Sequence, residues 1–392
     1  MAILAVNAGS STLKFSIYPV QDKQVLPSLL VGCIQGLEPG GQPLLEWKLN
    51  GQTHRRPLEC PQGDPFDHAL HSLRELLAGE STLPAITAVA HRVVHGGRDY
   101  ADSVLVTEAV LTRLARLNSL APLHQPNNLQ GIRAFQKAFP ALVQVACFDT
   151  AFHTTLPELA ASYALPQALS AQGLRRYGFH GLSYQYVMGV LQQRCSQANG
   201  RVLMAHLGNG ASLCGTLHGR SHATTMGFSA LDGLMMGTRC GTLDPGVLLY
   251  LMEQGWNHDQ MQSLLYKQSG LLGVSGISAD MRRLREDGSA AAQRAIDLFT
   301  HRVVRESGAL IACLGGLDVV AFSGGIGEHD AVLREQACAQ LAWLGLALDP
   351  ALNRQAVGSE VMAIHRADSR VQVWVVPTDE GLVAAREAAR LT

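Results

Sequence analysis

Paired cysteines, long apolar runs and a strong net charge are all missing from this sequence. None of the eight cysteines lies close to another, which argues against a disulfide framework or a zinc site and fits a reducing compartment. No stretch has the unbroken apolar length that spans a bilayer, and the N-terminal apolar run is broken at Asn7, unlike a signal peptide. A net charge of −1 offers no basic surface for nucleic acid or an anionic membrane. We therefore expect a soluble cytoplasmic protein that binds neither.

What the sequence does have is a glycine turn around which the chain is organised. Residues 202–217 (VLMAHLGNGASLCGTL) read as two short strands on either side of that turn. Gly208 and Gly210 are expected to give the turn positive φ angles and to leave room for a phosphate at the main chain. His206 and Ser212 add side-chain donors nearby. Taken alone, the pattern is more typical of an ordinary β-hairpin.

The N-terminus repeats this pattern. Residues 3–18 (ILAVNAGSSTLKFSIY) align with 202–217 without a gap, so that Asn7 meets His206 and Gly9 meets Gly208. The offset is about half of the chain, and 392 residues are too many for one ordinary core. We therefore expect two similar α/β domains, each presenting a polar hairpin to a shared cleft, an arrangement that suits a ligand with a chain of phosphates.

In the first half, charged side chains follow two predicted buried strands. Residues 85–90 lead into Arg92, and residues 142–147 end beside Asp149. In open α/β sheets, ligands bind at the carboxyl ends of the strands. We expect Arg92 and Asp149 to face the same ligand, and a structural ion pair of Arg92 remains the alternative.

Two histidines stand in distinctive loops. His124 lies between prolines in APLHQPNN, where Asn127 or Asn128 is expected to cap a helix that runs to residue 138. His180 has a glycine near it on either side in YGFHGLS, where Ser183 is expected to cap the helix that follows. A lone histidine is more often structural, but this setting favours a functional role for His180.

The second half holds two further glycine-rich loops. Arg239 lies in MGTRCGTLDPG, and an arginine in such a flexible loop is able to close over a transferring phosphoryl group. Residues 318–322 read as a strand that runs into SGGIG, after which Glu328 and His329 are expected to open a helix. A strand, a glycine loop and a helix N-terminus together form an anion or nucleotide site.

Together these motifs resemble the acetate kinase family (acetokinases, which include propionate kinases), members of the actin-like ATPase superfamily. The likeness covers nearly the whole chain, and the joint order of its motifs is highly specific. The motifs are VNAGSSTLKFS (6–16), HRVVHGG (91–97), APLHQPNN (121–128), FDTAFH (148–153), RYGFHG (176–181), HLGNGAS (206–212), MGTRCGTLDPG (236–246) and SGGIGE (323–328).

The resemblance implies an α/β fold of two duplicated actin-like ATPase (ribonuclease H-like) domains around a central cleft. The N-terminal domain would cover residues 1–150, with the C-terminal helix 380–392 packed back on it. Residues 151–379 would form the nucleotide-binding domain. The family also implies a homodimer, ATP and ADP as co-substrates, and Mg²⁺ or Mn²⁺ as the metal cofactor.

The resemblance further implies a role for each matching position. The residues that would act in catalysis are Arg92, Asp149, His180 and Arg239. Arg92 would do so by binding the carboxylate of the substrate. The residues that would hold the metal are Asn7 and Glu380. The residues that would shape the acyl pocket beside Arg92 are Val94, Leu123, His124 and Ala230. The residues that would bind ATP are Ser10, Thr12, Lys14, His206, Leu207, Gly208, Asn209, Gly210, Asp280, Met281, Arg282, Gly324, Gly325, Ile326, Gly327, Glu328 and His329.

Some positions depart from the family pattern. Ala230 stands where the family usually has proline, which leaves the acyl-chain preference open. Met281 replaces the commoner phenylalanine, which leaves the base preference open. His329 replaces an asparagine, and residues 379–381 read Asp-Glu-Gly in place of Asn-Glu-Glu.

The implied reaction is reversible in-line transfer of the γ-phosphoryl group of ATP to acetate, which gives acetyl phosphate and ADP. Acetate is already ionised near neutral pH, so the reaction needs placement and charge neutralisation rather than a general base. A propionate or other short-chain fatty acid kinase remains an alternative. A sugar kinase of the same fold would have a polar pocket, against which Val94 and Leu123 argue. A filament or switch ATPase of the actin type would not require so many side chains on the acceptor side.

Overall fold

The computed structural model describes residues 1–392 except 10, 39, 60–64 and 123. Ser10 and Leu123, two of the predicted site residues, therefore lie outside the described residues. The contacts between Cα atoms divide the chain into two compact units. Unit 1 comprises Met1–Ala151 together with Asp379–Thr392, and unit 2 comprises Phe152–Thr378.

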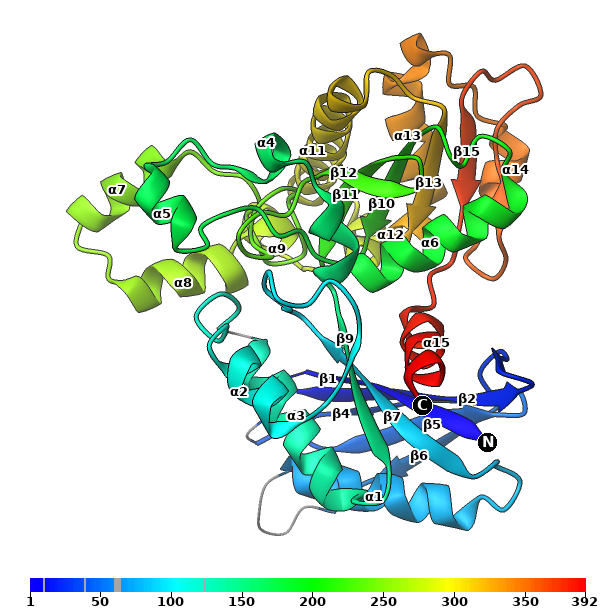
Figure 1. The fold of residues 1–392 in the computed structure, drawn as a ribbon. Helices are drawn as coiled ribbons and strands as arrows, with labels where there is room; N and C mark the ends of the chain where they lie inside the picture. The colour runs from blue at the N-terminus through cyan, green and yellow to red at the C-terminus, as the bar shows by residue number, and fades with distance from the viewer. Residues whose placement is uncertain (10, 39, 60–64, 123) are drawn as a thin grey trace. The chain divides into compact units, whose positions relative to one another are not determined.

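Unit 1 is built on a mixed sheet in the order β6-β5-β4-β2-β1-β7-β9-β8, with β3 beside β2 (Figure 1). Strands β1 and β2 form an antiparallel hairpin, while β1, β7 and β9 are parallel, so the carboxyl ends of these three strands share one edge. The strand bounds are β1 Ala2–Ala8, β2 Thr12–Gln21, β3 Gln24–Val25, β4 Leu30–Gln35, β5 Leu44–Leu49, β6 Gln52–Pro57, β7 Ile86–Val93, β8 Val104–Leu105 and β9 Val143–Phe148.

Helices cover both faces of this sheet. Apolar side chains of α1 and α3 pack with Leu4 and Val6 of β1 in one core, and α15 lies on the opposite face (Figure 1). Strand β1 is buried almost throughout because successive side chains point to opposite faces and both faces are covered. The helix bounds are α1 Pro65–Gly79, α2 Glu108–Ala115, α3 Gln125–Ala138 and α15 Glu380–Leu391.

Unit 2 has a second sheet in the order β12-β11-β10-β13-β15-β14, with apolar residues of α6 packed on one face. The strand bounds are β10 Arg201–Leu207, β11 Ala211–Leu217, β12 Arg220–Thr224, β13 Val319–Ser323, β14 Met362–Ala363 and β15 Gln372–Val375. The helix bounds are α4 Glu158–Ala161, α5 Gln167–Ala171, α6 Gly181–Arg194, α7 Pro245–Glu253, α8 His258–Lys267, α9 Gly270–Ser275, α10 Met281–Asp287, α11 Ala290–Leu314, α12 Gly324–His329, α13 Ala331–Gln340 and α14 Pro350–Gln355. Short 3₁₀ helices are η1 Ala151–Thr155 and η2 Ala342–Leu344.

The internal repeat is visible in the topology of the two sheets. In unit 1 the hairpin β1–β2 continues in parallel to β7 and β9, and in unit 2 the hairpin β10–β11 continues in parallel to β13 and β15. The two hairpins predicted from the sequence repeat are therefore present. Within the described residues, none of the helices combines the length and apolarity that crossing a membrane requires.

Two predicted helix caps are wrong. Helix α3 begins at Gln125 with His124 as its N-cap, so Asn127 and Asn128 lie in its first turn. Helix α6 begins at Gly181 after His180, so Ser183 also lies inside the helix. In each case the helix starts earlier than expected, because a proline in the first turn of α3 and the left-handed backbone of His180 place the start before the predicted cap.

Two predictions about the glycine-rich segments also need correction. Gly208 and Gly210 are not among the glycines with positive φ, so the hairpin turn does not need them for their backbone angles. Gly324, by contrast, has a φ of 74° and bends the chain directly after β13. Helix α12 therefore begins at Gly324, and Glu328 and His329 end this short helix instead of opening the next one.

Candidate active site

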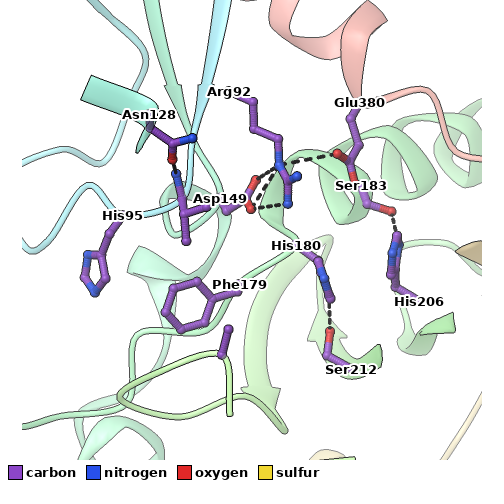
Figure 2. A network of polar contacts seen from close by, with 12 residues as sticks. Arg92, His95, Asn128, Asp149, Phe179, His180, Ser183, His206, Ser212 and Glu380 are labelled. Carbon is purple, nitrogen blue, oxygen red and sulfur yellow. Dashed lines mark hydrogen bonds and ion pairs between the residues drawn. The ribbon is translucent and has the colours of Figure 1, made fainter. Parts of the chain in front are cut away.

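In unit 1, Arg92 and Asp149 meet at the carboxyl ends of neighbouring parallel strands. Arg92 lies in β7, and Asp149 follows β9 with its N–H donated to the carbonyl of Val93 at 3.0 Å. The Arg92 Nε lies 3.0 and 3.1 Å from the two carboxylate oxygens of Asp149, and Nη2 lies 2.6 Å from Oδ2 (Figure 2). Glu380 Oε2 lies 3.5 Å from the same Nε. One guanidinium is thus held by two carboxylates, so the ion pair that the sequence analysis gave as the alternative for Arg92 is present.

Burial and charge act against each other in this cluster. Burial raises the pKa of the Asp149 carboxyl above its ordinary value, and the Arg92 guanidinium opposes that rise. Burial also disfavours the charged form of Arg92, but the carboxylates of Asp149 and Glu380 outweigh it and raise the pKa of the guanidinium. Arg92 therefore remains a cation within a largely buried site.

Amide side chains of α3 hold the strand ends around this cluster. Asn128 donates through Nδ2 to the carbonyl of Ala8 at 2.9 Å and accepts the N–H of Val94 through Oδ1 at 3.0 Å. Gln125 bonds both backbone groups of His95. Sequence reasoning missed both amides as positioning residues, although the run QPNN after His124 was the available signal. Val94 and His124, predicted for the acyl pocket, are half-buried beside these bonds.

The predicted metal ligands also belong to unit 1. Asn7 pairs with Lys14 across the β1–β2 hairpin. Asp379 accepts the hydroxyl of Tyr18 at 2.6 Å and caps α15, which places Glu380 in the first turn of that helix. Amide and carboxylate oxygens are the ligands that Mg²⁺ prefers, and this ion usually keeps several waters and binds one or two carboxylates plus substrate phosphates. The donor types of Asn7 and Glu380 therefore fit Mg²⁺.

In unit 2, His180 lies at the start of α6 in a left-handed conformation with φ 59° and ψ 26°. Such angles are uncommon for a residue other than glycine and are typical of functional sites. Its Nδ1 lies 2.9 Å from Ser212 Oγ, and Nδ1 of His206 lies 2.8 Å from Ser183 Oγ (Figure 2). The two imidazole rings stack with centroids 4.3 Å apart. His180 and His206 thus each have a hydroxyl partner that sequence reasoning did not assign.

A buried histidine supports the turn that precedes His180. His153 Nε2 lies 2.9 Å from the carbonyl of Phe179, and its Nδ1 lies 2.8 Å from Ser221 Oγ. Because a carbonyl only accepts, Nε2 carries the proton and the Ser221 hydroxyl donates to Nδ1. Burial lowers the pKa of His153 to about 4, so this arrangement is neutral at physiological pH. Gly178 packs on the ring, and a β-carbon there would come within 2.6 Å of it.

The predicted phosphate-binding groups of unit 2 converge on the hairpin turn. A β-carbon at Gly210 would lie 3.1 Å from Nη2 of Arg239 and 3.3 Å from Nε2 of His180. Arg239 also donates through Nη1 to the carbonyl of Ala230 at 2.6 Å. The glycine therefore serves to leave space where a cation and an imidazole meet the main chain.

Helix α12 is tied to this hairpin and to the C-terminal end of unit 2. A β-carbon at Gly324 would lie 2.7 Å from the carbonyl of Leu207. Glu328 Oε1 accepts the N–H groups of Gly324 at 2.8 Å and of Thr378 at 3.1 Å. Burial raises the pKa of Glu328, although both N–H groups oppose the rise. The buried Arg334 donates to the carbonyls of Gly327 and Glu328 and thereby stabilises the last turn of α12.

The predicted nucleotide residues at the start of α10 differ in exposure. Asp280 caps the helix and pairs with Arg282, whose side chain is 85% exposed, whereas Met281 is buried. Arg285 pairs with Asp330 at the end of α12 and so links the two nucleotide segments. This pair was missed by sequence reasoning because it joins residues distant in the chain.

Comparison with known proteins decides the family. The model of the Acetokinase family matches residues 2–386. An acetate kinase of Rhodopseudomonas palustris is 48% identical over 395 residues, which cover 99% of this chain and 98% of that protein. The chain belongs to the acetokinase family.

Solved structures of this family agree with the fold. A propionate kinase from Francisella tularensis superposes with a TM-score of 0.92 at 36% identity, with all of both chains covered. An acetate kinase from Porphyromonas gingivalis gives a TM-score of 0.88 at 35% identity and covers 100% of this chain and 99% of its own. The predicted duplicated actin-like ATPase fold and the predicted family are thereby confirmed. As an acetokinase, the protein is an ATP-dependent phosphotransferase.

Proposed function

We propose that this acetokinase transfers the γ-phosphoryl group of ATP reversibly to acetate, forming acetyl phosphate and ADP. The observation that carries the proposal is the Arg92 guanidinium, held by Asp149 at the ends of β7 and β9. The ion pair uses Nε and Nη2, so Nη1 supplies N–H donors for the carboxylate of the acceptor. Half-buried Val94 beside it suits a short apolar acyl group.

In this proposal Asp149 is not a base, because acetate carries no proton near neutral pH. It holds the guanidinium of Arg92 in one orientation through two parallel contacts. A lysine ammonium, which is a point charge, would not be oriented in this way. The buried carboxylate also keeps the local charge balanced when no acceptor is bound. Its role is to position Arg92 for an anion that attacks another anion.

The residues of unit 2 are assigned to the transferring phosphoryl group and to ATP. His180 and Arg239 meet at Gly210, where they would donate hydrogen bonds to phosphoryl oxygens as charge redistributes. The hairpin 206–210 and residues 324–328 of α12 would bind the phosphates, and the segment 280–282 would face the nucleoside. In unit 1, Thr12 and Lys14 of β2 would bind phosphates of ATP.

Asn7 and Glu380 would hold Mg²⁺, or Mn²⁺ in its place. The metal, when bound, neutralises charge on the β- and γ-phosphates of ATP. Glu380 would bind the metal only if its carboxylate is not fully engaged by Arg92. The atoms of Glu380 and Arg92 are 3.5 Å apart, which is longer than the 2.6 Å contact of Arg92 with Asp149.

Propionate is the second candidate acceptor. Ala230 is smaller than the proline that the family pattern has at this position, which would lengthen the acyl pocket. The structural neighbour from Francisella tularensis is named a propionate kinase. The same reaction with a longer acid needs no change in the charged residues.

We also propose a cytoplasmic homodimer. Helix α7 has apolar side chains that are well exposed, among them Leu249, Tyr250 and Met252, at 63%, 59% and 60%. Water contact of so many apolar side chains on one helix is typical of a surface that another chain covers. The described cysteines are all free, which agrees with a reducing compartment.

The test is kcat/KM with MgATP for acetate, propionate and butyrate, with hydroxylamine to trap the acyl phosphate. We expect acyl phosphate formation that depends on the acid, with acetate preferred. Ala230→Pro serves as the matched variant and should reduce the activity with propionate and butyrate more than that with acetate. ATP turnover that is the same without any acid, or no acyl phosphate from any of the three, would contradict the proposal.

A further inference from the structure

Two buried hydroxyl groups form a hydrogen-bonded chain that ends at the half-buried His180. The hydroxyl of Tyr184 on α6 lies 2.5 Å from Ser212 Oγ on β11, and Ser212 Oγ lies 2.9 Å from Nδ1 of His180. Tyr184 and Ser212 are fully buried. Water therefore does not reach the middle of the chain, and the buried hydroxyl of Ser212 finds its hydrogen-bond partners within the protein.

The direction of this chain follows from the chemistry of its members. A phenol is a better donor and a poorer acceptor than an aliphatic hydroxyl, so Tyr184 donates to Ser212. The lone pair of an imidazole nitrogen is a good acceptor, so the Ser212 proton goes to His180 Nδ1. Burial raises the pKa of Tyr184 well above its ordinary value, which keeps the donating proton on the phenol. Bonds that run in one direction also strengthen one another.

The surroundings of His180 favour a neutral ring. The imidazole of His206 stacks on it at 4.3 Å, and two cations at that distance would repel strongly. The guanidinium of Arg239 and the His180 ring would lie 3.1 and 3.3 Å from a β-carbon at Gly210, so Arg239 adds positive charge near the ring. A neutral ring whose Nδ1 accepts a hydrogen bond carries its single proton on Nε2.

We propose that Tyr184 and Ser212 are positioning residues that form a hydroxyl relay and set His180 in the tautomer with hydrogen on Nε2. The relay makes Nε2 a donor on the side where Arg239 meets Gly210, which is where the proposed function places the transferring phosphoryl group. The opposite tautomer would direct a lone pair at a phosphoryl oxygen and repel it. The role in catalysis rests on the proposed function, whereas the tautomer does not.

The tautomer is tested by ¹⁵N NMR of the full-length protein labelled at histidine, with His180→Gln used to assign the signals of that ring. We expect a protonated Nε2 and an unprotonated, hydrogen-bonded Nδ1 at pH 7.5. In Ser212→Ala, the two ¹⁵N shifts should move toward one another because both tautomers become populated. A protonated Nδ1 in the unaltered protein would overturn the relay, whatever reaction the protein catalyses.

Kinetics test the consequence for the reaction. Ser212→Ala should lower kcat roughly 10- to 100-fold, as the loss of a hydrogen bond that orients a histidine does in metal sites, with the KM values of both substrates changed little. Tyr184→Phe should lower kcat less, because Ser212 keeps its bond to His180. Ser212→Thr, which retains the hydroxyl, should recover most of the loss.

Ser307→Ala on α11 is the control, because Ser307 is equally buried and lies outside the site. Unchanged kcat in Ser212→Ala, or equal losses in Ser212→Ala and Ser212→Thr, would overturn the proposed role. If Ser212→Ala does not fold, the NMR spectrum of the unaltered protein and the kinetics of Tyr184→Phe decide the question. An absence of acyl phosphate from the unaltered protein would instead overturn the proposed function and leave the tautomer result standing.

Discussion

The two units hold their candidate site residues by different physical means. In unit 1 the central group is a cation between carboxylates, with Arg92 bonded to Asp149 and close to Glu380. In unit 2 the central groups are two imidazoles with hydroxyl partners, and the cation Arg239 is held by a backbone carbonyl. Both sets follow from the same hairpin and parallel strands, so the shared fold does not determine the chemistry of the site.

The difference teaches where charge is needed. A carboxylate acceptor is an anion that must be brought to another anion, and a buried cation with fixed partners meets that need. The charge of the phosphoryl group only redistributes during transfer. For the groups around it, the orientation of their hydrogen bonds and the space between them therefore matter more than added charge. Substitutions that remove charge should therefore act most strongly in unit 1, and substitutions that change shape should act in unit 2.

The largest effect is expected for Asp149→Asn, which keeps the size of the side chain and removes its charge. Arg92 then loses its strongest partner, and its guanidinium is free to reorient in a buried site. We expect kcat to fall on the order of 10³-fold, as for the loss of a group that organises transition-state charge. Steady-state kinetics with acetate and MgATP provide the measurement.

The matched control for that prediction is Asp318→Asn in unit 2. Asp318 makes an equivalent two-point ion pair with Arg201, at 2.9 and 2.6 Å, outside the candidate site. Its loss should leave kcat within about twofold, because the pair lies outside the candidate site and an ion pair with such exposure contributes little to stability. Equal effects of the two substitutions would mean that Asp149 acts only through stability.

Arg239→Lys is expected to give the next largest effect. A lysine retains the charge but not the planar fork that reaches both the carbonyl of Ala230 and the space beside Gly210. We expect kcat to fall roughly 10²-fold while the KM values for acetate and ATP change by less than about threefold. A change confined to KM would show that Arg239 binds substrate in the ground state and does not stabilise the transition state.

Much of this arrangement was predictable from the sequence because its signals are local. The strands that end at Arg92 and Asp149 and the repeated hairpins each depend on residues that are adjacent in the chain. The partners were not predictable in the same way. Ser212 and Ser183 were not assigned to His180 and His206, because such bonds depend on how α6 packs on the sheet.

The same limit explains the incorrect details. Periodicity locates a helix, but its first residue depends on backbone angles such as those of His180, which no composition signal reveals. The turn glycines were expected to supply positive φ, the commonest reason for glycine, whereas the structure uses Gly210 for space. The Asn128 amide was taken for a cap although it joins two strand ends.

Gly210→Ala tests whether shape is decisive in unit 2. A methyl group there would lie within 3.1 Å of Arg239 and 3.3 Å of His180, so both side chains would have to shift by a few tenths of an ångström. Because small misplacements of catalytic groups are costly, we expect kcat to fall roughly 10-fold. Gly308→Ala on α11, where a β-carbon meets nothing within 4 Å, is the control and should leave kcat unchanged. Full activity of Gly210→Ala would show that this space is not required.

The smallest effect concerns the stability of unit 2 and its dependence on pH. The pKa of His153 is about 4 in the folded protein and near the ordinary value of 6.5 when unfolded. Between these values the unfolded state binds more protons, so the stability that neutral His153 provides is lost as the pH falls. From pH 7 to pH 5 this contribution amounts to about 2 kcal/mol.

Urea denaturation of the unaltered protein and of His153→Gln at pH 7 and pH 5 provides the measurement. The variant should be less stable at pH 7, because it disrupts the bonds to Phe179 and Ser221, but its stability should decline less between the two pH values. His91→Gln in unit 1 is the counterpart, since burial also lowers the pKa of His91 to about 4. If each unit unfolds in its own transition, each substitution should flatten the pH dependence of only its own unit. Parallel pH profiles of His153→Gln and the unaltered protein would mean that His153 titrates equally in both states, and the neutral support of the His180 turn would then have to come from elsewhere.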